Sequence, residues 1–70
     1  MWKSNEMDGD IMTDAEIKEY IKTHRSITMS ALKRDVISTS PQIIGVYHEW
    51  MFDIITIVTP ENKFVFFENH

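Results

Sequence analysis

The sequence contains no cysteine, only two glycines and two prolines, and no long apolar run. The lack of cysteine excludes disulfide bonds and thiolate metal sites. With glycine only at Gly9 and Gly45, the chain has no glycine-rich loop that could bind phosphate. A membrane-spanning helix needs about 20 apolar residues, and residues 1–12 lack the basic start and apolar middle of a secretory signal. We therefore expect a cytoplasmic protein that makes no contact with membranes.

The chain has 70 residues, which is enough for one small domain. A domain of this size buries only ~60% of the surface that its unfolded chain exposes, and its core contributes roughly 3–5 kcal/mol. Residues 1–12 have no apolar periodicity and are predicted to be a flexible acidic leader, whereas residues 13–70 are predicted to form one α+β domain. Because disulfides are excluded, we expect this domain to oligomerise or to bind a partner.

The net charge of −4 conceals an uneven distribution along the chain. Acidic residues predominate before and after residues 18–34. Five of the seven basic residues lie within that window: Lys18, Lys22, Arg25, Lys33 and Arg34. One interpretation is a solvated helix surface with ordinary ion pairs. The other is a small basic patch that binds phosphate or an acidic protein surface.

Two helices are predicted in the first half of the chain. The letters TDAE at residues 13–16 form a capping box, and the apolar stripe behind it predicts a helix over residues 14–24. A second helix is predicted over residues 29–36, with Thr28 as its cap and Met29, Leu32 and Val36 facing inward.

Residues 52–68 are predicted to form a β-hairpin. Its strands, residues 54–58 and 64–67, are rich in β-branched and aromatic side chains. Between them, Pro60 suits the second position of a turn and Asn62 tolerates the left-handed conformation. Neither strand alternates apolar with polar residues, so both hairpin faces need cover.

A chain this short can cover only one of those faces with its own helices. We therefore expect the other face to bind either another protein or a second copy of the chain in a homodimer. The sequence does not decide which face points outward. The expected interface consists of Ile55, Ile57, Val65 and Phe67.

Residues 41–51 fit two structures. Ser40 followed by Pro41 is a helix-start signal, the apolar spacing fits a helix, and no turn signal separates Trp50 from Asp53. However, the letters IIGVY at residues 43–47 are typical of a strand, and Gly45 disfavours a helix. We prefer a helix and keep a strand as the alternative.

With three helices followed by a hairpin, the order of elements resembles the winged helix-turn-helix architecture. The stretches that carry the resemblance are ITMSALKRDV, SPQIIGVYHEW and FDIITIVTPENKFVFFE. It implies a third helix in the major groove of DNA, with Gln42, His48 and Lys63 facing the nucleic acid. Residues 41–51 contain no lysine or arginine, and DNA affinity depends largely on neutralising phosphates. Nucleic acid is therefore a disfavoured partner.

No catalytic, metal or cofactor site is predicted. His24, His48 and His70 stand at no recognisable spacing from a nucleophile or a carboxylate. We expect an α+β fold, winged-helix-like, with two helices and a three-stranded antiparallel meander as the alternative. The expected function is a small non-catalytic interaction module, such as a regulator or inhibitor from a phage or mobile element. The alternative function is a dimeric winged-helix transcriptional regulator.

Overall fold

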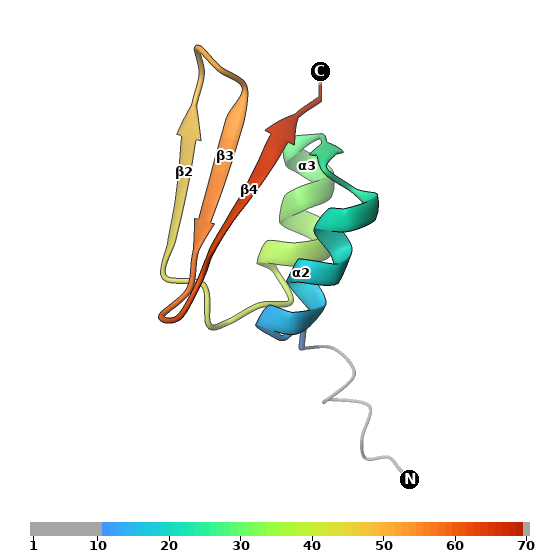
Figure 1. Ribbon diagram of the computed structural model, residues 1–70, viewed down its shortest axis with the longest axis vertical. Coiled ribbons are helices and arrows are strands. Elements are labelled where there is room, and N and C mark those ends of the chain that lie inside the picture. Colours follow the sequence, from blue (N-terminus) through green and yellow to red (C-terminus); the bar gives the residue numbers. More distant parts are fainter. Residues whose placement is uncertain (1–10, 70) are drawn as a thin grey trace, which may run out of the picture.

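Two helical segments lie on one side of a four-stranded sheet in the computed structural model, which describes residues 11–69 (Figure 1). The predicted α+β class is confirmed. His70 and most of the expected leader, residues 1–10, lie outside the described residues. Met12, the last residue of that leader, is attached to the domain, because its N–H donates a 2.7 Å hydrogen bond to the Thr39 carbonyl.

Helix α2 (Asp14–Thr23) begins at the predicted capping box. The Thr13 hydroxyl accepts a hydrogen bond from the Glu16 N–H at 3.3 Å, and Glu16 Oε1 accepts one from the Thr13 N–H at 2.8 Å. Ile17 is fully buried and Tyr20 is half-buried. The apolar stripe read from the sequence therefore faces the core.

Helix α3 (Met29–Leu32) continues into η1 (Lys33–Ile37), which has the wider winding of a π-helix. The Thr28 hydroxyl caps the segment by accepting from the Ala31 N–H at 3.2 Å. Leu32 and Val36 are fully buried, as predicted. The Tyr20 hydroxyl donates to Asp35 Oδ2 at 3.1 Å, so this bond joins the two helical segments.

The sheet has the order β1-β4-β3-β2. Strands β2 (Gly45–Glu49), β3 (Ile54–Val58) and β4 (Lys63–Glu68) form an antiparallel meander, and the hairpin of β3 and β4 is confirmed. The two-residue strand β1 (Ser26–Ile27), which was not predicted, pairs in parallel with β4. Figure 1 shows the helices beside β4 and β2 farthest from them.

The preferred prediction of a helix over residues 41–51 is wrong, and the strand alternative is correct. Ser40 and Pro41 belong to a turn, in which the Ile43 N–H donates to the Ser40 carbonyl at 3.1 Å. The turn between β2 and β3 has Asp53 at φ 54°, and aspartate is one of the few residues that adopt this left-handed conformation readily. Without a third helix, the winged-helix architecture is absent from the described residues.

The turn between β3 and β4 also differs from its prediction. Asp53 is the only non-glycine residue with a positive φ in the described range, so Asn62 does not adopt the left-handed conformation. Instead, the Thr59 hydroxyl accepts from the Asn62 N–H at 3.1 Å, and the Thr59 N–H donates to the Asn62 carbonyl at 2.9 Å. A side-chain bond of the kind that favours threonine in turns therefore closes this one.

Asp14, at the start of α2, joins the helical layer to this turn. Its carboxylate accepts hydrogen bonds from Asn62 Nδ2 and Thr59 Oγ1, both at 2.7 Å, and from Gln42 Nε2 at 3.1 Å. Bonds from Asn62 first, and then from Thr59 and Gln42, lower the pKa of Asp14 below its ordinary value.

The core lies between the helices and the face of the sheet toward them. Because successive side chains of a strand point to opposite faces, the register places Ile55 opposite Phe66, and Ile57 opposite Phe64, on this inner face. All four are at most 5% exposed. The full buried cluster is Ile17, Ile27, Leu32, Val36, Ile55, Ile57, Phe64 and Phe66.

Candidate functional site

The opposite face of the sheet, here called the outer face, is covered by none of the described segments. The register assigns to it every second residue of the three long strands, in three rows across the sheet. The rows are Gly45, Val58 and Lys63; Tyr47, Thr56 and Val65; and Glu49, Ile54 and Phe67.

Most of the outer face is apolar. Tyr47 is 60% exposed, Val65 is 43% exposed and Phe67 is 41% exposed. On the central strand, Ile54 and Val58 are half-buried by their neighbours. An antiparallel sheet with one wet face normally alternates apolar and polar side chains, so this composition is typical of a face that contacts another surface.

The Tyr47 ring lies over Gly45, two residues earlier on the same face. A Cβ atom at Gly45 would lie 2.9 Å from Tyr47 Cε2 and 3.0 Å from its hydroxyl oxygen, both closer than normal contacts. Gly45 therefore leaves the room that the ring occupies, and the ring in turn shields the backbone of β2.

The turn between β2 and β3 adds three consecutive exposed apolar side chains. Trp50 is 76% exposed, Met51 is 88% exposed and Phe52 is 65% exposed. The turn follows Glu49, the last residue of β2, and together these four residues line a shallow depression. The turn therefore adds exposed apolar surface at one end of the sheet, where the Trp50 ring lies beside that of His48.

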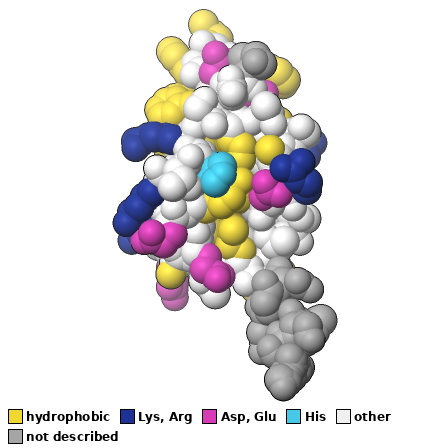
Figure 2. Space-filling view, turned by 90° about the vertical axis from the view of Figure 1, so that its right-hand side faces the viewer, with side chains coloured by type: hydrophobic (Ala, Val, Ile, Leu, Met, Phe, Trp, Pro, Cys, Tyr) yellow, Lys and Arg dark blue, Asp and Glu magenta, His cyan; other side chains and the backbone are white. Residues whose placement is uncertain are grey.

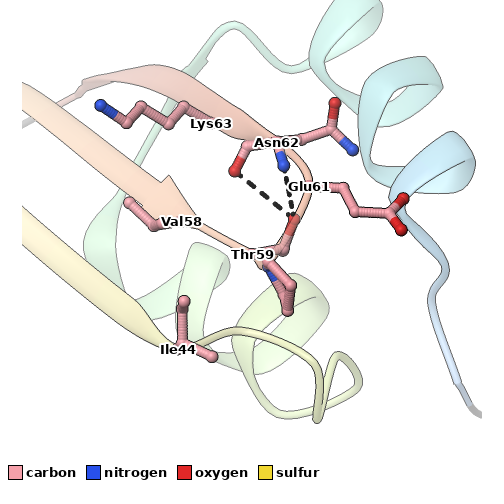
Figure 3. A pocket seen from close by; sticks show the side chains of 7 residues that line it. Ile44, Val58, Thr59, Glu61, Asn62 and Lys63 are labelled. Carbon is pink, nitrogen blue, oxygen red and sulfur yellow. Dashed lines mark hydrogen bonds between the residues drawn. The ribbon is translucent and has the colours of Figure 1, made fainter.

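A second shallow depression lies at the other end of the sheet, beside the turn between β3 and β4. Figure 3 shows Ile44, Val58 and Lys63 among the side chains that line it, while the Asn62 amide points toward helix α2. Ile44 is 68% exposed. This depression extends the outer face beyond the first residue of β2.

Strand β2 is an edge strand, and the helices do not cover its inner side. Val46 is 40% exposed there. His48 Nε2 lies 2.5 Å from Glu68 Oε1, and its ring centroid lies 4.1 Å from that of Trp50. Both side chains of the His48–Glu68 pair are largely buried. The pair connects β2 to β4 across β3 on the inner face.

The expected interface mixed the two faces of the hairpin. Ile55 and Ile57 are fully buried beneath the helices, so their prediction as outward-facing residues is wrong. Val65 and Phe67 do lie on the outer face. Tyr47 was missed because its segment was expected to be a helix.

The five residues of the candidate basic patch do not share one environment. Lys22 Nζ lies 3.1 Å from Glu19 Oε2, and Arg34 Nε lies 2.8 Å from Asp35 Oδ1. The Arg25 guanidinium lies 6.0 Å from the centroid of the Phe67 ring, beside the outer face. Lys18 and Lys33 are exposed on the helical layer. Figure 2, which shows the helical side, has charged side chains of both signs around an apolar stripe.

The residues expected to face DNA do not form one surface. The Gln42 amide donates to the Met12 carbonyl at 2.7 Å as well as to Asp14. His48 is paired with Glu68 on the inner face. Lys63 lies on the outer face, at the end of β4. The structure therefore gives the DNA-binding alternative neither its groove-entering helix nor a common face for these residues.

The described residues contain no group of three or more histidine or acidic side chains that could hold a metal ion. No helix in residues 11–69 is both long enough and apolar enough to span a membrane. The fold and the outer face define a small α+β protein in which the helices of residues 11–69 leave one largely apolar sheet face uncovered. Comparison with known proteins finds no matching family model, no similar curated protein and no similar solved structure.

Proposed function

We propose that this chain is a small non-catalytic module that binds a protein surface through the outer face of its sheet. The observation that carries the proposal is that one sheet face bears apolar side chains on all three long strands, while the described helices cover only the other face. The partner is either a second copy of the chain or a different protein.

The exposed turn at Trp50, Met51 and Phe52 supports the same proposal. Aromatic residues and methionine are enriched at protein interfaces, where they supply large contact areas. Acidic residues, Glu49 and Asp53, flank this turn in the sequence. Negative charges beside an apolar tip favour a protein partner over an anionic lipid surface, which attracts basic segments.

The experiment compares Val65→Asp with Lys18→Asp. Val65 lies in the middle row of the outer face and is 43% exposed, whereas Lys18 is exposed on helix α2. We expect both variants to fold, as judged by far-ultraviolet circular dichroism. Only Val65→Asp should abolish association, because a carboxylate buried at an apolar contact has no partner.

Association is measured by light scattering for self-binding and by affinity capture from the native cell for other partners. A partner that binds the wild type and Lys18→Asp, but not Val65→Asp, supports the proposal. A wild-type chain that stays monomeric at high micromolar concentration and captures nothing in a Val65-dependent manner would contradict it.

A further inference from the structure

We infer that the outer face binds a second copy of this chain, packed sheet against sheet about a two-fold axis parallel to the strands. The inference rests on the proposed function and identifies its partner. It is drawn from the positions of the charges on and beside the outer face, since charges at an interface select the partner and the register.

The three rows of the outer face contain two charged side chains, Glu49 and Lys63, and Arg25 lies beside them. Glu61 lines the depression at the Lys63 end of the sheet. Glu49 lies on β2, at one edge of the sheet. Lys63 lies on β4, and Arg25 lies over Phe67 on the side of β4 away from β2. All three are exposed, and none forms an ion pair within the described residues. At the end of the sheet that holds Glu49 and Phe67, one edge of the face is therefore acidic and the opposite edge is basic.

A two-fold axis parallel to the strands places the β2 edge of each copy over the β4 edge of the other. Glu49 then faces Phe67 and Arg25 of the second copy, and this contact occurs twice. Lys63 faces Gly45 of the second copy and the Tyr47 ring above it, where a cation is favourable. This arrangement opposes charges of unlike sign and keeps the strands nearly aligned, as in most sheet packings.

The apolar residues are self-complementary about the same axis. The central strand β3 packs on its own copy, so Ile54, Thr56 and Val58 each meet their equivalents. The register also places Val65 of the second copy opposite Tyr47, beside the ring that is folded over Gly45. An axis perpendicular to the strands would instead place Lys63 of one copy against the corner of Phe67 and Arg25, which opposes like charges.

The size of the face sets the expected strength of the dimer. Three strands ~4.8 Å apart, each with about five residues at ~3.4 Å per residue, cover roughly 14 by 17 Å. A standard interface buries about 800 Å² per partner. The three strands alone cover less than this, so we expect a weak dimer with a dissociation constant in the micromolar range.

The experiment uses two charge reversals, Glu49→Lys and Arg25→Glu, in the full-length chain. Each reversal alone places like charges together twice in the homodimer, so we expect each variant to dimerise at least tenfold more weakly than the wild type. In an equimolar mixture of the two variants, the introduced lysine of one chain meets the introduced glutamate of the other. The unchanged Glu49 and the unchanged Arg25 meet at the second contact. We therefore expect the mixture to recover a heterodimer.

Sedimentation velocity across a micromolar concentration series measures these equilibria, and far-ultraviolet circular dichroism checks the fold. Glu19→Lys and Lys18→Glu are matched controls, because they make comparable charge reversals on the exposed surface of helix α2. Both controls should dimerise as the wild type does. A salt titration of the wild type is a second readout, since rim charges are screened and the dimer should weaken as salt rises.

A wild-type monomer at high micromolar concentration, or a mixture that stays monomeric while both variants are folded, would overturn the inference. The proposed function is judged separately. If the wild type is monomeric but a different protein binds it in a Val65-dependent manner, self-association fails and the interaction module stands. If neither kind of binding occurs, both fail.

Discussion

Some hydrogen bonds between the helical layer and the sheet depend on a single residue, and Asp14 is the clearest case. Its carboxylate receives three hydrogen bonds from the turn between β3 and β4 and from Gln42, and these bonds lower its pKa. The sequence marks Asp14 only as part of a capping box. Its hydrogen bonds to Asn62 and Thr59 could not be predicted from the local sequence, because these residues lie more than 40 positions away along the chain.

The lowered pKa of Asp14 predicts how stability depends on pH. A carboxyl group whose pKa is lower in the folded state stabilises the fold above its unfolded pKa, near the ordinary value of 3.8. That stabilisation is lost as the pH falls through the folded pKa. We expect Asp14→Asn to be less stable than the wild type at neutral pH and to lose less stability on acidification below pH ~4.

Urea denaturation from pH 6 to pH 2 measures this difference, with Glu19→Gln as the control on the exposed surface of α2. Glu19 pairs with Lys22 at a site where both side chains are well exposed, so its removal should change little. Parallel pH profiles for the wild type and Asp14→Asn would contradict the role given to Asp14.

Ser40 gives a second prediction for a single residue. It is 1% exposed, and its hydroxyl is the only buried side-chain group in the described residues without a hydrogen-bond partner. A buried polar group without a partner is costly. We therefore expect Ser40→Ala to be neutral or to stabilise the protein by up to about 1 kcal/mol.

The neighbouring Thr39 is the matched control, because its hydroxyl donates to the Asp35 carbonyl at 2.9 Å. Thr39→Ala should cost about 1 kcal/mol. Thermal denaturation of both variants gives the comparison. A destabilised Ser40→Ala variant would mean that its hydroxyl is satisfied in solution.

Among the elements, the hairpin of β3 and β4 was predictable because its strand composition and its turn residues agree. The identity of its inner face was not, because Ile55 and Ile57 on one face are as apolar as Val65 and Phe67 on the other. Only packing against the helices distinguishes the faces. The expected interface was therefore half wrong, although the inference of one uncovered face follows from the same lack of alternation.

The structure of residues 41–51 could not be predicted for a different reason. Serine followed by proline starts helices and also forms turns, so Ser40 and Pro41 could not decide between them. The turn before β3 depends on Asp53 in a left-handed conformation, which no glycine or asparagine marks in the sequence. β1 was missed for another reason. It has two residues and exists only because β4 lies beside it.

Two adjacent residues of β4 test which face of this strand is packed within the chain. Phe66 is fully buried on the inner face, whereas Phe67 is 41% exposed on the outer face. We expect Phe66→Ala to cost about 3–5 kcal/mol, which is comparable to the whole stability of a domain this small. Phe67→Ala should cost about 1 kcal/mol in the monomer.

Urea denaturation at low protein concentration measures both variants, so that association does not contribute to stability. A large difference in stability between the Phe66 and Phe67 variants is the expected result. Similar losses of stability would mean that the outer face is packed within one chain and is not free to bind a partner.

At the scale of the whole molecule, residues 11–69 form one helical layer against a sheet that carries apolar side chains on both faces. The helices lie beside β4 and leave β2, the outer face and the turn at Trp50 uncovered by described residues (Figure 1). The helical side carries mixed charges around its apolar stripe (Figure 2). We therefore expect the outer face to be the contact surface and the helical side to stay exposed to solvent.

Amide chemical-shift mapping by nuclear magnetic resonance tests that claim most directly. Spectra of the wild-type chain are compared over a dilution series, and then with any captured partner. The account predicts concentration- or partner-dependent shifts at Tyr47, Thr56 and Val65, with helix α2 unchanged. Shifts confined to the exposed surface of α2, or spectra that change under neither condition, would contradict it.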